Sequence, residues 1–204
     1  MRAINLFNKW VSLGKDDGME ANHGPSVDYM LDLVPSNILN QQFSFLDIGC
    51  GNGWVVRKVS QFMKCNNAIG IDGSDNMIKK AILKDSKSKY LKLNIDNLKN
   101  FNQTFDIIFS MEVFYYLKNP QKIMNYIFNN LLKSGGCCII GIDHYLENTA
   151  SLHWQHDLNV DMCTYSIFQW KKILKNAGFS NVFSSQFGNK KDWAGTLVLY
   201  GEKP

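Results

Sequence analysis

The sequence predicts one α/β domain built on a doubly wound sheet of seven strands, mostly parallel with an antiparallel C-terminal edge strand. Seven short β-rich runs carry this prediction, over residues 43–48, 68–72, 90–94, 105–110, 137–143, 181–187 and 196–200. Segments with helical patterns separate the first five runs, which is typical of right-handed βαβ crossovers in a parallel sheet. Residues 188–195 are too few for such a crossover, so the last two strands are expected to form an antiparallel hairpin.

Capping residues mark the ends of the predicted helices. The dipeptide Asn119-Pro120 predicts a helix start, and apolar residues at a spacing of four continue the helix until Gly135 and Gly136 end it. Ser74 is expected to cap an earlier helix, which follows the second strand. These helices are the crossovers that a parallel sheet requires.

Two further helices are predicted near the ends of the chain. Ser166 and Gln169 have the spacing of a capping box, and Gly178 stands where a left-handed C-cap belongs. Near the N-terminus, Ser26 is expected to cap a short helix that Pro35 terminates.

The length of 204 residues is enough for one full domain. No internal repeat, low-complexity tract or linker divides the sequence. We therefore expect residues 1–204 to form a single domain, in which residues 1–40 are an N-terminal helical lid or extension.

Composition and charge exclude several classes of protein. With 45% hydrophobic and 20% charged residues, the chain is neither disordered nor collagen-like. No apolar stretch approaches the ~20 residues of a membrane span, and no apolar signal region opens the chain, so we expect a cytoplasmic protein without a membrane partner. The five cysteines form no C-x-x-C pair and are expected to be reduced thiols. The formal charge of +4 is spread without a block of lysines longer than two, so no nucleic-acid partner is expected.

The most informative segment follows the first predicted strand and reads Asp47-Ile48-Gly49-Cys50-Gly51-Asn52-Gly53. Ligands of open parallel sheets bind outside the carboxyl ends of the strands. Glycines at alternate positions permit a tight turn and a close approach of ligand to backbone, and the following helix start favours a negatively charged group. The spacing fits neither the dinucleotide pattern G-x-G-x-x-G nor the P-loop, which needs Lys and Ser or Thr. A nucleotide-like ligand is predicted, with NAD, FAD and a Walker-type ATP site disfavoured.

Residues 45–53 resemble the first motif of the class I S-adenosylmethionine (SAM)-dependent methyltransferases, an acidic residue followed by alternate glycines at the end of strand 1. Residues 70–77 resemble the second motif, which has an acidic residue, a helix cap and a methionine. Residues 93–98, 104–117 and 132–136 resemble the segments that follow strand 3, form strand 4 and precede strand 5. The resemblance implies a Rossmann-like fold, SAM as the cofactor and S-adenosylhomocysteine as the product.

The resemblance also implies a set of cofactor-binding residues. Asp72 is expected to accept hydrogen bonds from both ribose hydroxyls, as acidic residues do in dinucleotide sites. Asn94 stands where the family commonly has Asp, and its side-chain carbonyl is expected to accept the bond from the adenine amino group. The complete predicted set is Tyr29, Asp47, Gly49, Cys50, Gly51, Asn52, Gly53, Asp72, Gly73, Met77, Asn94, Ile95, Asp96, Ser110 and Met111.

Structural roles are the alternatives for these residues. The glycine segment is then a turn without a ligand, and Asp72 is only a helix-capping carboxylate. Met77 is then a core residue, and Ser110 and Met111 serve packing alone.

Methyl transfer from a sulfonium is an in-line displacement, so the protein mainly has to hold the nucleophile ~3 Å from the methyl group and exclude water. A hydroxyl or protonated amine acceptor also requires a general base. The predicted catalytic residues are His144 and Tyr145, which follow the fifth strand, and Tyr115, whose ring is a candidate to stabilise the sulfonium. No metal is expected, with a site formed by His153, His156 and Asp157 as the alternative.

The acceptor predicted from the sequence is a small molecule. The Asn/Asp-Pro-Pro-Tyr/Phe motif of amino-methylating nucleic-acid enzymes is absent after strand 4, and no basic stripe replaces it. The predicted function is therefore transfer of a methyl group from SAM to a small molecule. The alternatives are a nucleic-acid or protein methyltransferase and a SAM-binding domain without catalysis.

Overall fold

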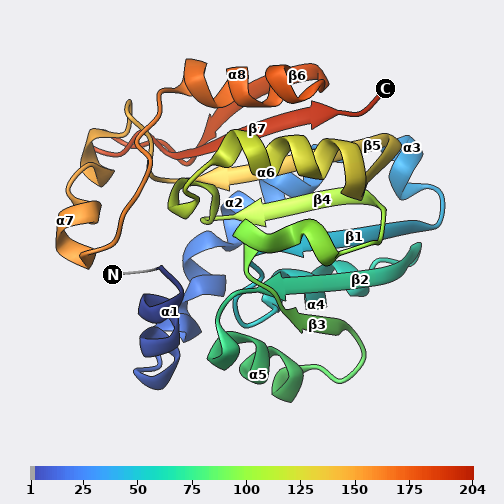
Figure 1. Cartoon of the computed structure of the whole chain (residues 1–204), viewed down its shortest axis with the longest axis horizontal. Helices are drawn as coiled ribbons and strands as arrows, with labels where there is room; N and C mark the ends of the chain where they lie inside the picture. Colours follow the sequence, from blue (N-terminus) through green and yellow to red (C-terminus); the bar gives the residue numbers. More distant parts are fainter. Residues whose placement is uncertain (1–2) are drawn as a thin grey trace.

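Seven strands form one sheet in the order β3-β2-β1-β4-β5-β7-β6 in the computed structural model, which describes residues 3–204 (Figure 1). The strands are β1 (Phe43–Ile48), β2 (Cys65–Asp72), β3 (Lys89–Lys92), β4 (Phe105–Met111), β5 (Leu132–Ile142), β6 (Ser180–Phe187) and β7 (Thr196–Glu202). The strands β1 to β5 pair in parallel, while β7 pairs antiparallel with both β5 and β6. The predicted fold class is confirmed.

The position of the C-terminal strand differs in detail from the prediction. β7 lies between β5 and β6, so the edge of the sheet is β6. Every residue of β7 before Glu202 is buried, whereas β6 alternates between partly buried and exposed residues. The more apolar strand takes the inner position because both of its faces are covered there.

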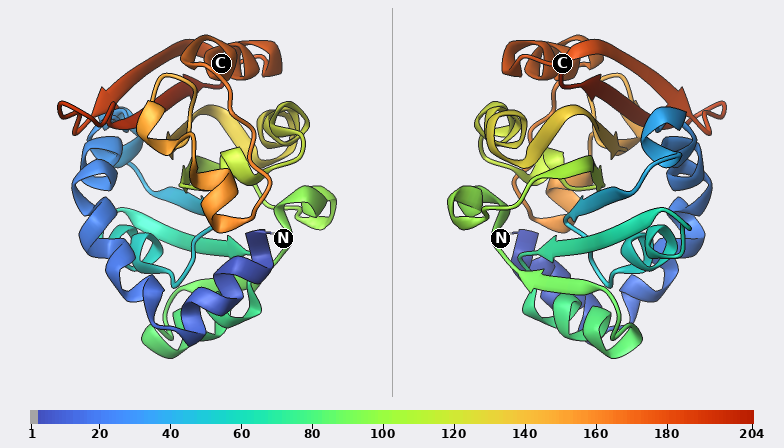
Figure 2. Two further views of the ribbon diagram at one scale, coloured as in Figure 1. Left: turned by 90° about the vertical axis from the view of Figure 1, so that its left-hand side faces the viewer. Right: turned by 90° about the vertical axis from the view of Figure 1, so that its right-hand side faces the viewer.

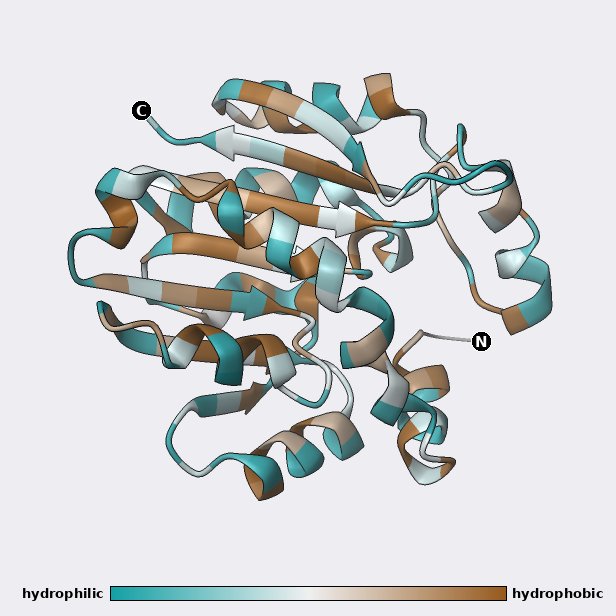
Figure 3. Cartoon of the chain, turned by 180° about the vertical axis from the view of Figure 1, so that it is seen from behind, coloured by the Kyte–Doolittle hydropathy of each residue, from teal (hydrophilic) through white to brown (hydrophobic). Residues whose placement is uncertain are grey.

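Helices cover both faces of the sheet (Figure 2). The helices and helical turns are α1 (Ala3–Ser12), η1 (Lys15–Gly18), α2 (Met19–Asp32), α3 (Ser36–Leu39), α4 (Trp54–Ser60), α5 (Asp75–Lys84), η2 (Ile95–Asn100), η3 (Phe114–Tyr116), α6 (Pro120–Tyr126), η4 (Ile127–Leu131), η5 (Thr149–Ser151), α7 (Trp154–Leu158) and α8 (Ile167–Ala177). Apolar side chains of α6 and α8 pack on one face, and those of α2, α3, α4 and α5 pack on the other. The central strands between these two layers are mainly hydrophobic (Figure 3).

Most of the predicted helix ends are present. Ser166 and Gln169 form the capping box of α8, and Gly178 ends that helix with a φ of 108°. Ser74 accepts a hydrogen bond from the Met77 N–H at the start of α5. These side chains satisfy backbone groups that a helix end leaves unpaired.

Two helix predictions are wrong in their boundaries. Ser26 caps no helix; it lies inside α2, and its hydroxyl is hydrogen-bonded over 2.9 Å to the hydroxyl of Thr196 in β7. The helix that begins at Pro120 ends in the π-helical turn η4, and β5 starts at Leu132, before the glycine pair. Leu132 pairs with Phe105 of β4, so sheet pairing takes over before the sequence signal for a helix end.

The N-terminal segment is mainly helical from Ala3 to Leu39 and packs against the rest of the chain, while residues 1–2 of the predicted extension lie outside the described residues. α1 contacts α5, and α2 contacts β5. Its role as a lid stays a prediction. Within residues 3–204, no helix is long and apolar enough to cross a membrane. All five cysteines are free thiols, and Cys50, Cys137 and Cys138 are buried.

Candidate active site

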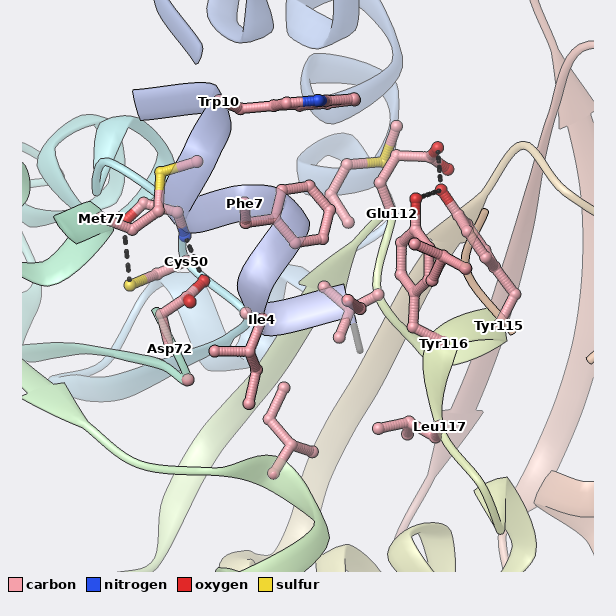
Figure 4. Close-up of a pocket in the computed structure, with 18 of the residues that line it drawn as sticks. Ile4, Phe7, Trp10, Cys50, Asp72, Met77, Glu112, Tyr115, Tyr116 and Leu117 are labelled. Atoms are coloured by element: carbon pink, nitrogen blue, oxygen red, sulfur yellow. Dashed lines mark hydrogen bonds between the residues drawn. The ribbon is translucent and has the colours of Figure 1, made fainter. Parts of the chain in front are cut away.

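A cavity of about 1080 Å³ opens at the carboxyl ends of the parallel strands (Figure 4). Its walls come from α1, the start of α2, the glycine loop after β1, the ends of β2, β4 and β5, and the region of α7. This is the edge at which open α/β sheets bind their ligands. The cavity is at the upper end of the size range of single-ligand pockets, which leaves room for two reactants.

The glycine loop forms one wall of the cavity. Gly49 and Gly51 have φ values of 80° and 53°, a backbone conformation that side chains with a Cβ rarely adopt. A Cβ added at Gly51 would lie 3.8 Å from the sulfur of Met19 and 3.9 Å from that of Met77, in the open space of the cavity. The backbone of the loop is therefore accessible to a ligand.

Asp72, the last residue of β2, holds this loop in place. Its Oδ2 accepts a hydrogen bond from the Gly51 N–H over 2.9 Å, and its Oδ1 accepts one from the Ser74 N–H over 2.7 Å. Each carboxylate oxygen keeps a further lone pair, so Asp72 can also accept hydrogen bonds from ligand hydroxyls. Burial raises the pKa of Asp72, while the two backbone N–H groups lower it.

Acidic side chains stand at the carboxyl ends of four parallel strands, namely Asp47, Asp72, Glu112 and Asp143, and all four line the cavity. Burial raises the pKa of each of them. Buried carboxyls of this kind favour a ligand that brings positive charge or hydrogen-bond donors. A sulfonium ligand with ribose hydroxyls and an amino group meets this requirement.

α1 forms one wall of the cavity. Ile4, Phe7 and Trp10 line the cavity (Figure 4). The ring of Phe7 packs edge-on against the ring of Tyr116, with the two ring centroids 5.4 Å apart. The side chain of Asn8 anchors the helix by accepting a hydrogen bond of 2.7 Å from the Ser74 hydroxyl. No sequence motif marks these residues as part of a site, although apolar residues recur at helical spacing in this segment.

The inner end of the cavity is acidic and aromatic. Glu112 has a φ of 61° and accepts hydrogen bonds from the Tyr115 hydroxyl over 2.8 Å and from the Asp143 N–H over 2.5 Å. The rings of Tyr115 and Tyr116 lie 4.3 Å apart, and His23 of α2 also lines the cavity. Glu112 was not among the predicted site residues; the signal in the sequence is an acidic residue directly after a strand.

Most of the predicted site residues come together in this cavity. Asn94 caps η2 by accepting from the Asp96 N–H over 3.1 Å. The predicted residues that line the cavity are Asp47, Gly49, Cys50, Gly51, Asp72, Gly73, Met77, Asn94, Ile95, Asp96, Met111 and Tyr115. Their individual contacts with a ligand stay predictions.

Three predicted cofactor residues lie behind the cavity wall, which corrects the expectation of direct contact. Asn52 is buried, and its amide donates to the Asp16 carboxylate over 3.0 Å. A Cβ at Gly53 would collide with a tyrosine ring of β3 at 2.5 Å, so this glycine serves packing. The Ser110 hydroxyl donates to a β1 carbonyl over 2.7 Å.

The histidine and tyrosine predicted to be catalytic after strand 5 do not line the cavity either. His144 is fully buried, with its ring nitrogens hydrogen-bonded to the Ser151 carbonyl and the Thr164 hydroxyl over 3.0 and 2.8 Å. The Tyr145 hydroxyl donates to two backbone carbonyls and accepts from Gln186 over 2.8 Å. Because their polar atoms are engaged in holding the loop after β5, neither residue is placed to act on a ligand.

Tyr29 is also outside the cavity. Its hydroxyl donates to the Ser185 hydroxyl over 2.9 Å, and its ring stacks on Phe187 at 4.8 Å. These contacts join α2 to β6. The expected contact of Tyr29 with the cofactor is therefore corrected.

The alternative metal site is not assembled. His153 and His156 each approach Asp157, over 3.5 and 3.2 Å, but all three side chains are exposed to solvent. Within the described chain, no group of three or more His, Cys, Asp or Glu residues is placed to hold a metal ion.

Comparisons with known proteins agree with this geometry. A family model described as a methyltransferase domain matches residues 21–183. The mitochondrial ubiquinone biosynthesis O-methyltransferase of Dictyostelium discoideum is 26% identical over 166 residues, which cover 74% of this chain and 51% of that protein. A tRNA U34 carboxymethyltransferase of Aliivibrio salmonicida is 32% identical over 99 residues. The matched residues cover 45% of this chain and 30% of that protein. The chain thus spans about half or less of the length of these curated relatives.

A solved structure matches over nearly the whole chain. It is one chain of the complex between the Haloferax volcanii Trm112 methyltransferase activator and the putative methyltransferase, with 25% identity, a TM-score of 0.84 and 97% of both chains covered. A SAM-dependent methyltransferase of Thermotoga maritima, described as a possible histamine N-methyltransferase, has 17% identity, a TM-score of 0.73 and coverage of 98% of this chain and 99% of its own, which shows the fold alone. The chain therefore belongs to the class I SAM-dependent methyltransferases, and SAM is its cofactor.

Proposed function

We propose that this chain transfers the methyl group of SAM to a small-molecule acceptor that enters the same cavity. The observation that carries the proposal is a cavity with two chemically different sides (Figure 4). At one end lie the glycine loop and Asp72, and at the other lie Glu112 and two tyrosine rings.

The first end fits SAM. The absence of a side chain at Gly51 lets a ligand approach the loop closely, and the carboxylate of Asp72 provides an acceptor for the hydroxyls of a nucleoside. Asn94 and Ile95 line the same wall and are proposed to contact the adenine. When bound, SAM supplies a methyl group on a positively charged sulfur.

The second end suits a small acceptor. Tyr115 and Tyr116 offer ring faces that can stabilise positive charge, and Trp10 and Phe7 of α1 exclude water from above. Buried carboxyls form this end of the cavity, so the phosphate backbone of a nucleic acid is disfavoured there. The tRNA-modifying relatives match less than half of this chain, so their acceptor does not transfer to it.

The first test is calorimetric titration of the purified chain with SAM, S-adenosylhomocysteine and NAD. We expect micromolar binding of the first two and none of NAD. Tritiated methyl-SAM is then supplied with three pools, a low-molecular-weight cell extract, total RNA and total protein. Label in the small-molecule pool supports the proposal, whereas label in RNA or protein contradicts the proposed acceptor class.

A second proposal concerns a partner. The similarity to a chain in the complex with the Trm112 methyltransferase activator extends over 97% of both chains, so we propose that this chain can also bind an activator of that kind. The test is SAM affinity and solubility with and without the Haloferax volcanii activator. No complex on size-exclusion chromatography would contradict it.

A further inference from the structure

We propose that His23 accepts the proton of the methyl acceptor, with Asp143 orienting its imidazole, so that the acceptor is a molecule whose reacting oxygen or nitrogen carries a proton. This inference rests on the proposed function. His23 takes the role predicted for His144, and the residues involved come from α2 and from the ends of β4 and β5.

His23 and Asp143 come from different elements and meet in the cavity wall. The Nδ1 of His23 lies 4.0 Å from the Oδ2 of Asp143, and both residues line the cavity. The His23 side chain is 27% exposed and that of Asp143 is 9% exposed. The histidine can therefore be reached by a ligand while its carboxylate partner is sheltered. A distance of 4.0 Å is longer than a hydrogen bond, but such contacts commonly tighten when the reactants bind.

Asp143 is held in a fixed position. Its N–H donates to Glu112 Oε1 over 2.5 Å, and its carbonyl accepts from the Asn148 side chain over 2.7 Å. Its Oδ1 has no hydrogen-bond partner among the described residues, although the Thr196 hydroxyl lies close enough to lower the pKa of the carboxyl. A fixed carboxylate that faces one nitrogen of a histidine sets which nitrogen carries the proton.

The protonation states agree with this arrangement. Burial lowers the pKa of His23, so the imidazole is neutral at pH 7 and can accept a proton, while Asp143 partly offsets this by stabilising the charged form. Glu112 lies against Asp143 and accepts its N–H, and the cavity is also lined by the titratable side chains of Lys15, Tyr115, Tyr116, His153 and Asp157. With Nδ1–H directed at Asp143, the lone pair is on Nε2.

The other cavity histidine is less suited to the task. His153 is 62% exposed and faces Asp157 over 3.5 Å. A base in contact with solvent exchanges its proton with water, and water is not excluded from the reacting atom beside it. His23 is the more enclosed of the two.

Proton balance then restricts the acceptor. The proton of the acceptor hydroxyl or protonated amine goes to His23 Nε2, and the electron pair left on oxygen or nitrogen forms the bond to the methyl carbon. The carbon–sulfur bond breaks with its electrons going to sulfur, which leaves neutral S-adenosylhomocysteine. A carboxylate acceptor has no proton to give and would bring a further negative charge beside the acidic side chains of Glu112 and Asp143. We therefore infer a hydroxyl or amine acceptor.

The first experiment needs no acceptor. The imidazole of His23 is followed by NMR from pH 4.5 to 9 in the full chain saturated with S-adenosylhomocysteine, and its signals are assigned with His23→Gln. We expect a neutral form protonated at Nδ1, and a pKa that falls by about 0.5 or more in Asp143→Asn, because the carboxylate charge is lost. Asp157→Asn is the matched control and should leave His23 unchanged. An Nε2–H tautomer, or a His23 that ignores Asp143→Asn, would overturn the dyad.

The second experiment tests the acceptor class and the catalytic role. Tritium-labelled product from the low-molecular-weight extract is treated with mild alkali, which releases volatile methanol from methyl esters but not from ethers or amines. Base-stable label supports the inference, and base-labile label refutes it. His23→Gln is expected to lower label incorporation by about 100-fold or more, with the Kd for S-adenosylhomocysteine within about twofold of the wild type. An unchanged rate in this variant would remove His23 from catalysis.

Different results would contradict the proposed function and the proposed role of His23. If neither SAM nor S-adenosylhomocysteine binds, the proposed function fails. If the cofactor binds and methyl transfer occurs with an unresponsive His23, only the present inference fails.

Discussion

Asp72→Asn separates the structural role of this carboxylate from its proposed role in cofactor binding. The carboxylate accepts two backbone N–H bonds, from Gly51 over 2.9 Å and from Ser74 over 2.7 Å. An amide of the same shape can accept only one of them, and an unpaired N–H costs about 1–3 kcal/mol. Removal of a charge that burial disfavours acts in the opposite direction. We expect these effects to offset each other, leaving the free energy of unfolding within about 2 kcal/mol of the wild type.

The effect on the cofactor should be larger. Hydrogen bonds to a charged group contribute about 1.5–3 kcal/mol, and every 1.4 kcal/mol is a factor of ten in affinity. Loss of one such bond to a ribose hydroxyl predicts a SAM affinity about 10- to 100-fold weaker. Asp72→Ala is a less informative variant, because it leaves both N–H groups without an acceptor.

The assay combines urea unfolding with calorimetric titration of SAM. Asp75→Asn is the matched control, since Asp75 lies in the first turn of α5, pairs with Lys79 and Lys92, and does not line the cavity. Its SAM affinity should equal that of the wild type. A folded Asp72→Asn protein that binds SAM with an unchanged Kd would refute the assignment of Asp72 to the ribose.

Three further predictions follow from the cavity wall. Gly51→Val should abolish the SAM binding that calorimetry detects, because the φ of 53° at this position disfavours a β-branched residue and the added side chain enters the cavity. Normal SAM binding by this variant would mean that the loop is not the cofactor site. Phe7→Ala should weaken SAM binding several-fold without a large change in urea unfolding, because Phe7 covers the cavity at the ring of Tyr116; an unaltered Kd would argue against a lid. Glu112→Gln should be more stable than the wild type at neutral pH. Since burial raises the folded-state pKa of Glu112, wild-type stability falls as pH rises above the unfolded-state value of about 4.5, and the advantage of the variant should grow over that range; a constant difference between pH 4.5 and 8 would contradict it.

Local sequence signals predicted the elements that depend on near neighbours. The first strand was predicted with its observed bounds, Phe43–Ile48, because its apolar run ends at a glycine turn. The capping box of Ser166 and Gln169 and the C-cap at Gly178 form within one helix and need no distant partner. Ser26 failed as a cap because a residue 170 positions away in the sequence, Thr196, takes its hydroxyl.

The sequence by itself determined the sheet, the glycine loop and the acidic residue after β2, since strand periodicity and backbone conformation are local properties. Only the tertiary structure decided which polar side chains face the cavity. His144 lies two residues after the end of β5, yet its ring nitrogens are hydrogen-bonded to Ser151 and Thr164. His23, far away in the sequence, reaches the cavity from α2. The direction of a side chain depends on which partners the fold brings to it, and those partners lie on other elements whose positions a local pattern does not specify.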